Sequence, residues 1–180
     1  MGWKAIVFCA LAGVSLVQIF YYLFFFRRVA FFKPPVKDHS QQHPVSVIIC
    51  AQDESKNISA NLPSILTQHY SSTHEVIVVN DNSADESKYI LEDLQKTHKK
   101  LQVIELTQQA KGIAGKKFPL SIGIKEAKHE IILLTDADCA PASEYWVFKM
   151  QDAFTEGVEV VLGYGAYTKA PGLLNKIIRF

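Results

Sequence analysis

Short apolar runs that alternate with helix-like segments constrain the fold of this 180-residue chain more than any other feature. Residues 45–51 read VSVIICA, a nearly continuous apolar run of the kind found in strands buried on both faces. From Asp53 onward the apolar residues recur at the period of a helix. Strands are expected at 45–51, 75–80, 101–106, 131–135 and 158–162. Four helices are expected: one that begins near Asp53, one that follows a capping box formed by Ser83 and Glu86, one at 118–128 and one at 143–154. This alternation predicts an α/β fold with a mostly parallel sheet covered on both faces.

An uncharged apolar segment precedes this body. Residues 5–26 contain no charged side chain over 22 positions, and a helix that crosses a bilayer core needs about 20 apolar residues. A cleaved signal peptide is disfavoured, because its apolar region usually has only about 7–15 residues and ends at small side chains. Here the segment ends in Phe24, Phe25 and Phe26, directly before Arg27. We therefore expect one retained transmembrane helix.

Basic residues flank this segment unequally. Lys4 precedes it, whereas Arg27, Arg28, Lys33 and Lys37 follow it, and loops rich in Lys and Arg tend to stay in the cytoplasm. We expect a single-pass anchor in the cell membrane with the body in the cytoplasm. The expected division is a transmembrane anchor with its basic flank at 1–33, a polar, proline-bounded linker at 34–44 and a globular domain at 45–180.

Charge and cysteine content exclude several classes of function. The formal net charge of +1, without a basic stripe, argues against nucleic-acid binding. Cys9 lies in the apolar segment, and Cys50 and Cys139 lie in or beside strand-like runs. This placement favours reduced thiols without metal-ligand spacing over a disulfide framework. The six histidines form no zinc-binding pattern.

Acidic residues gather where the expected strands end. Asp53 and Glu54 follow the first strand, Asp81 follows the second, and Asp136 and Asp138 follow the fourth. Ligands of open parallel sheets bind beyond these carboxyl ends. Two aspartates two positions apart on extended chain can share a cation through oxygen ligands, as Mg²⁺ and Mn²⁺ prefer. They can equally end the strand and cap the next helix.

The other acids also have two interpretations each. Asp81 could accept hydrogen bonds from a base or a ribose, or it could form an Asx turn with the Asn82-Ser83 pair that follows it. Asp53 and Glu54 could instead be first-turn acids that stabilise the N-terminus of a helix. None of these residues identifies a site when taken alone.

The lysine- and glycine-bearing loop at 111–117 (KGIAGKK) is similar to a phosphate-binding loop but is not a P-loop. Its glycines are three apart, and a lysine stands where Ser or Thr would follow Gly115-Lys116. Lys116 either neutralises a diphosphate or faces solvent at the start of a helix. The chain contains no GxGxxG or GxSxG motif, which disfavours dinucleotide binding and a hydrolase elbow.

Four stretches of this sequence resemble glycosyltransferase family 2, in that family's order and spacing. They are VSVIICAQDESKNI, EVIVVNDNSADES, GKKFPLSIGIKEAKHEIILLTDADCAP and VVLGYG, which together span about residues 44–167. The resemblance implies the Rossmann-like sheet of the GT-A type, with 45–180 as the N-terminal, donor-binding part of the domain. It also implies inverting transfer from a nucleotide-diphosphate sugar, with Mg²⁺ or Mn²⁺ as cofactor.

The resemblance implies roles for individual residues. Ala51, Asp53 and Glu54 match the segment that lines the base, and Asp81 matches the acid that contacts the nucleoside. Lys116 matches the lysine near the nucleotide. Asp136 matches the first acid of the DXD motif, near the ribose, and Asp138 matches the metal-binding acid of that motif. Cys50, Gln52 and Asn80 depart from the family's usual residues, which leaves the metal site intact and the base preference open. The family's catalytic base lies well downstream of this motif. We therefore expect a truncated chain that supplies the donor half-site, with no catalytic residue assigned before Phe180.

The resulting hypothesis is a membrane-embedded glycosyltransferase. It would move a sugar, expected from a UDP-sugar, to a lipid or polysaccharide acceptor at the cytoplasmic membrane face. One alternative is a non-catalytic module that binds nucleotide sugars. The other is a nucleotidyltransferase of related fold, although the glycine- and arginine-rich signature expected after its first strand is absent.

Overall fold

The computed structural model describes residues 2–31, 43–107 and 115–179. The chain divides into two compact units, Met1–Asp38 and His39–Phe180, each of which is described by itself. The linker expected at 34–44 lies almost entirely outside the described residues, as does the first part of the lysine- and glycine-bearing loop.

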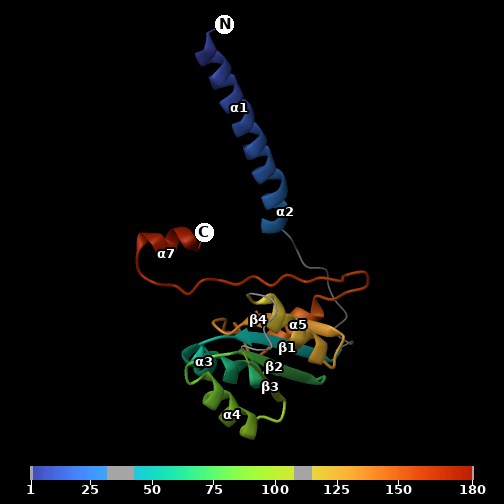
Figure 1. Ribbon diagram of the computed structural model, residues 1–180. Coiled ribbons are helices and arrows are strands. Elements are labelled where there is room, and N and C mark those ends of the chain that lie inside the picture. The colour runs from blue at the N-terminus through green and yellow to red at the C-terminus, as the bar shows by residue number, and fades with distance from the viewer. Residues whose placement is uncertain (1, 32–42, 108–114, 180) are drawn as a thin grey trace. The chain divides into compact units, whose positions relative to one another are not determined.

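The N-terminal unit is one long helical segment. It consists of α1 (Trp3–Tyr21), the π-helical turn η1 (Tyr22–Phe26) and α2 (Arg27–Ala30) (Figure 1). Trp3–Phe26 is 24 residues long, and its most apolar window has a mean hydropathy of 2.1 and no share buried in protein. This helix is therefore long and apolar enough to cross a membrane.

The described residues of the C-terminal unit form a four-stranded parallel sheet, which confirms the expected α/β fold. Its strands are β1 (Val45–Ala51), β2 (His74–Asp81), β3 (Leu101–Leu106) and β4 (Ile131–Asp136), in the order β3-β2-β1-β4. Every residue of the two central strands is buried, whereas the edge strands are partly exposed. The most continuous apolar runs thus form the centre of the sheet, where both faces need cover.

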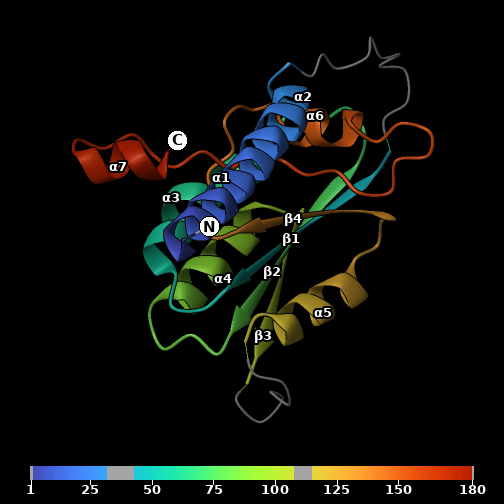
Figure 2. The ribbon, with the colours of Figure 1, turned by 90° about the horizontal axis from the view of Figure 1, so that it is seen from above.

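Helices cover both faces of this sheet. Figure 2 shows α3 (Ser55–Leu66) and α4 (Ser87–Thr97) on one face and α5 (Lys117–Glu126) on the other. The larger core cluster lies on the α3 side, where Ile58, Leu62, Ile65 and Leu66 are buried as their helical spacing predicts. A smaller cluster on the α5 side contains Cys50, Ile77 and Val79, with Leu120 packed against it.

Two short helices complete the described chain. α6 (Trp146–Asp152) is shorter than the helix expected at 143–154, and its Val147 is fully buried in the larger core cluster. α7 (Leu173–Ile178) is the last helix of the described residues.

The prediction of a fifth strand at 158–162 is wrong. These residues have no strand structure, and Val160 and Leu162 are 75% and 91% exposed. An apolar run becomes a strand only when a neighbouring strand takes up its backbone hydrogen bonds. No strand among the described residues pairs with this segment.

The prediction of a capping box at Ser83 and Glu86 is also wrong. Glu86 is itself the N-cap of α4, without a side-chain cap bond, and the helix begins at Ser87. Asp85 provides the hydrogen bonds instead. Its Oδ1 accepts from the backbone N–H of Ser87 at 3.0 Å, and its Oδ2 accepts from the backbone N–H of Ser55 at 2.9 Å. One carboxylate therefore joins the starts of α3 and α4.

Candidate functional site

The carboxyl ends of β1, β2 and β4 form a common edge that carries acidic side chains. The register pairs Cys50 of β1 with Asp136 on one side and with Val79 on the other. Paired residues of parallel strands point to the same face, and side chains along a strand alternate, so Asp81 shares the face of Val79. Asp81 and Asp136 therefore lie at the same edge and on the α5 face, on the two strands that flank β1.

Cys50 lies between these acids. It is 9% exposed, and burial raises the pKa of its thiol. The charges of Lys116, Asp136 and Asp81 also act on that pKa, the lysine lowering it and the two acids raising it. Three charged groups thus surround one buried thiol at the strand ends.

Lys116 brings the start of α5 to this edge. It is the N-cap residue of α5, and its Nζ donates a hydrogen bond to Oδ1 of Asp136. The two side chains are 54% and 58% exposed, so this ion pair remains accessible to solvent and to a ligand. Lys116 faces the acids rather than standing alone at a helix start.

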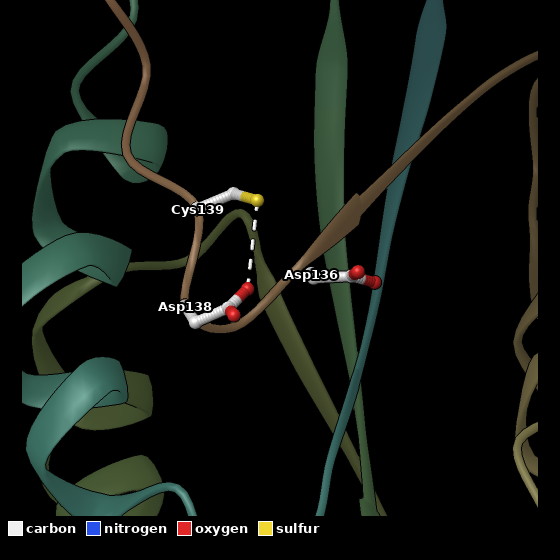
Figure 3. A group of neighbouring side chains, drawn as sticks. All are labelled: Asp136, Asp138 and Cys139. Atoms are coloured by element: carbon white, nitrogen blue, oxygen red, sulfur yellow. Dashed lines mark hydrogen bonds between the residues drawn. The ribbon is translucent and has the colours of Figure 1, made fainter. Parts of the chain in front are cut away.

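Asp138 lies in the turn after β4, because the strand ends at Asp136 rather than continuing. The turn is closed by a hydrogen bond of 3.1 Å from the backbone N–H of Cys139 to the carbonyl oxygen of Asp136. The thiol of Cys139 donates to Oδ1 of Asp138 at 3.5 Å (Figure 3). One potential ligand atom from each of these three residues lies within 4.8 Å of the other two.

Cys139 is the residue that sequence reasoning missed. None of the three cysteines was expected to have metal-ligand spacing, yet the turn places the Cys139 sulfur beside both aspartates. The only signal in the sequence was its position directly after the DXD motif. Partial desolvation, and then the hydrogen bond that the thiol donates to Asp138, raise the pKa of this thiol.

Asp53 joins the loop after β1 to the loop after β2. Its Oδ1 accepts from the backbone N–H of Ala84 at 2.6 Å, and its own N–H donates to Oγ of Ser83 at 2.9 Å. Its φ of 55° is in the left-handed region, which aspartate tolerates better than most residues. Asp53 therefore precedes the helix and is not one of its first-turn acids.

Ala51 and Glu54 occupy the two sides of this connection. Ala51 ends β1, is 2% exposed and belongs to the larger core cluster on the α3 side. Glu54 is the N-cap residue of α3, and its Oε2 accepts from Nδ2 of Asn57 at 2.5 Å. It makes no side-chain cap bond to the helix backbone.

These residues fit a divalent cation with a diphosphate. Two carboxylates supply the oxygen ligands that Mg²⁺ and Mn²⁺ prefer, and a nearby ammonium group suits phosphate oxygens. Asp136 and Asp138 come from β4 and its turn, Asp81 from β2 and Lys116 from α5. The tertiary fold thus assembles one charged edge from three separate parts of the chain.

Comparison with known proteins gives a consistent result. The family model described as Glycosyl transferase family 2 matches residues 46–176. The chain is 29% identical over 140 residues to a poly-β-1,6-N-acetyl-D-glucosamine synthase of Staphylococcus epidermidis, which covers 77% of this chain and 31% of the relative. It is 33% identical over 101 residues to a β-monoglucosyldiacylglycerol synthase of Trichormus variabilis, which covers 56% of this chain and 21% of the relative. The chain thus spans about a third or less of the length of these relatives.

A solved structure supports the same assignment of fold. The mannosyltransferase PcManGT from Pyrobaculum calidifontis, in complex with GDP-Man and Mn²⁺, superposes with a TM-score of 0.66 at 26% sequence identity. The match covers 79% of this chain and 41% of that one. The described sheet and helices therefore have the arrangement of a GT-A glycosyltransferase.

Proposed function

The chain belongs to glycosyltransferase family 2, and on this basis we propose that it binds the donor for metal-assisted, inverting transfer of a sugar from a nucleotide diphosphate. The donor we propose is a UDP-sugar. The observation that carries the proposal is the single edge at which Asp81, Asp136 and Lys116 meet, on one face of the sheet. The GDP-Man and Mn²⁺ bound by the structural relative support a nucleotide-sugar donor and a divalent cation here.

Roles follow from the chemistry of each side chain. Asp138 and Asp136 would hold the cation, which when bound neutralises negative charge on the departing diphosphate. Lys116 would bind the phosphate oxygens as a point charge. Asp81 would orient the nucleoside by accepting its hydrogen bonds. Asp136 would also lie near the ribose.

The segment after β1 would line the base. Ala51, the last residue of β1, would border the base at the strand end. Asp53 and Glu54 would form the wall beside it, and the bonds of Asp53 to Ser83 and Ala84 would hold that wall in place. This arrangement makes the base pocket a product of two loops.

The acceptor reaction also needs a base that removes a proton from the acceptor hydroxyl. We assign no residue of this chain to that step. We propose that the chain supplies the donor half of the reaction, with 45–180 as the donor-binding part of a GT-A domain.

We further propose that the reaction takes place at the cytoplasmic face of the cell membrane. The support is the apolar helix at Trp3–Phe26, followed by Arg27 and Arg28. We propose that 1–33 anchors the chain and that 34–44 links the anchor to the domain. The names of the relatives, a polysaccharide synthase and a glycolipid synthase, support a polysaccharide or lipid acceptor.

Calorimetry on the full chain in detergent tests the donor site. UDP-sugars and GDP-sugars are titrated with Mn²⁺, with Mg²⁺ and with EDTA. Binding should require the cation, and Asp138→Ala should remove most of the affinity, about tenfold or more. Asp93→Ala is the matched control, because Asp93 is an exposed aspartate of α4 whose contact is the i,i+3 ion pair with Lys96. Equally tight binding in EDTA would contradict the proposed metal role.

A further inference from the structure

Both aspartates of the proposed cation site are already engaged by other side chains of the protein. Asp136 accepts from the ammonium group of Lys116, and Asp138 accepts from the thiol of Cys139. In Figure 3 the carboxylate of Asp138 points toward Cys139, whereas that of Asp136 points away from Asp138. A cation that binds both aspartates therefore competes with Lys116 for the charge of Asp136 and with Cys139 for that of Asp138.

We propose that Lys116 is an internal counter-ion that competes with the divalent cation for Asp136, and that the donor diphosphate removes this competition by drawing the lysine away. The inference rests on the proposed function, because it takes Asp136 and Asp138 as the cation site. Its consequence is that cation and donor bind cooperatively at this edge, each favouring the other.

The physical basis is electrostatic exclusion at one oxygen. An ammonium group on Oδ1 of Asp136 and a divalent cation at the same carboxylate repel each other strongly at contact distance. Either the lysine moves away or the cation binds this carboxylate more weakly. In either case Lys116 lowers the affinity of the cation in the absence of a donor.

The position of Lys116 allows it to move. Its side chain is 54% exposed and its four-carbon stem is flexible, so the ammonium group can change partners without a change in the fold. A diphosphate offers more negative charge than one carboxylate and would compete for the ammonium group. Coupling between two ligands is reciprocal. A diphosphate that frees Asp136 therefore raises the affinity for the cation, and the cation raises the affinity for the diphosphate by the same factor.

The neighbouring lysine provides a matched control. Lys117 is the first residue of α5, and among the described residues it makes no ion pair with Asp136 or Asp138. Lys117→Gln removes the same charge as Lys116→Gln one residue further on. Any difference between the two variants therefore reports contact with Asp136 rather than the general charge of the region.

The test measures Mn²⁺ binding to the full chain in detergent by the electron paramagnetic resonance signal of free Mn²⁺, without nucleotide. Lys116→Gln should bind Mn²⁺ about five- to tenfold more tightly than the wild type. Lys117→Gln and the charge-preserving Lys116→Arg should stay within about twofold of the wild type. In excess UDP, and in a parallel series with GDP, the advantage of Lys116→Gln should disappear. Circular dichroism and the unfolding midpoint verify that each variant is folded.

The outcomes separate this inference from the proposed function. If Asp138→Ala abolishes Mn²⁺ binding while Lys116→Gln binds no more tightly than Lys117→Gln, the cation site stands and the competition is refuted. If neither the wild type nor Lys116→Gln binds Mn²⁺, with or without UDP or GDP, both ideas are refuted. An advantage of Lys116→Gln that persists unchanged in UDP and in GDP would overturn the claim that the donor draws the lysine away.

Discussion

Gly123 of α5 lies directly against Ile48 of β1. A Cβ atom at Gly123 would lie 2.6 Å from Cγ2 of Ile48 and 3.2 Å from Cγ2 of Val79. The absent side chain thus sets how closely α5 approaches the sheet, and α5 carries Lys116 at its start. Close packing at this point connects the core of the domain to the charged edge.

Gly123→Ala should destabilise the domain by about 1–3 kcal/mol, because an added methyl group in a packed core forces the helix or its neighbours to shift. Thermal unfolding followed by circular dichroism measures the effect. Ser121→Ala, at an exposed position of the same helix, should change stability little. If the clash with Ile48 is the cause, Ile48→Ala combined with Gly123→Ala should cost less than the sum of the two single variants.

Asp53 should affect stability and donor binding separately. Asp53→Ala loses the hydrogen bond to the backbone N–H of Ala84. It also places alanine at a φ of 55°, a conformation that alanine disfavours. We expect a loss of about 1–2 kcal/mol. Asp53→Asn keeps an oxygen acceptor and tolerates this φ, so its stability should remain near that of the wild type. If nucleotide affinity and stability fell in parallel in both variants, Asp53 would have only a structural role.

His74 should make the domain sensitive to acid. It is 1% exposed, and neither ring nitrogen has a hydrogen-bond partner among the residues that the structure describes. Burial, followed by the charges of Lys100 and His129, lowers its pKa to about 4. Between pH 6.5 and about 4 the unfolded chain binds the proton and the folded chain does not. Stability should therefore fall as the pH falls through this window, by about 1.4 kcal/mol for each unit of the pKa shift.

Unfolding midpoints measured from pH 7 to pH 4 provide the check for His74. His74→Leu removes the titrating group without leaving a hydrogen-bond partner unsatisfied, so its stability should depend less on pH than that of the wild type. His69→Gln, at an exposed histidine beside Glu144, is the control and should keep the wild-type profile. Identical profiles for the wild type and His74→Leu would exclude this histidine as the source of acid sensitivity.

Cys139 should influence which cations the site accepts. A thiolate is a soft ligand that favours cations such as Cd²⁺, whereas carboxylates suit Mg²⁺ and Mn²⁺. Cys139→Ser should therefore lower Cd²⁺ affinity by about tenfold and change Mn²⁺ affinity by less than about twofold. The ultraviolet charge-transfer absorbance of a cadmium–thiolate bond gives a direct measurement. Cys9→Ser is the matched control, and its cadmium absorbance should equal that of the wild type.

The α/β fold and its central strands could be predicted from local pattern alone. The runs at 45–51 and 75–80 were apolar because both faces of a central parallel strand are covered, and the structure places β1 and β2 there with at most one residue of difference at either end. The run at 158–162 was also mostly apolar and is not a strand. Composition reports the tendency to be buried, but only a partner with free backbone groups makes a strand.

The sequence by itself determined the apolar N-terminal helix, the alternation of strands and helices, and the presence of acids at the strand ends. These properties depend on neighbouring residues, so periodicity reveals them. Only the tertiary structure decided that Lys116 pairs with Asp136, that the sulfur of Cys139 lies beside Asp138, and that Asp53 joins two loops. The contact between Lys116 and Asp136 joins residues 20 positions apart, and the contact between Asp53 and Ala84 joins residues 31 positions apart. They depend on strand register and on the path of each turn, which side-chain chemistry alone does not specify.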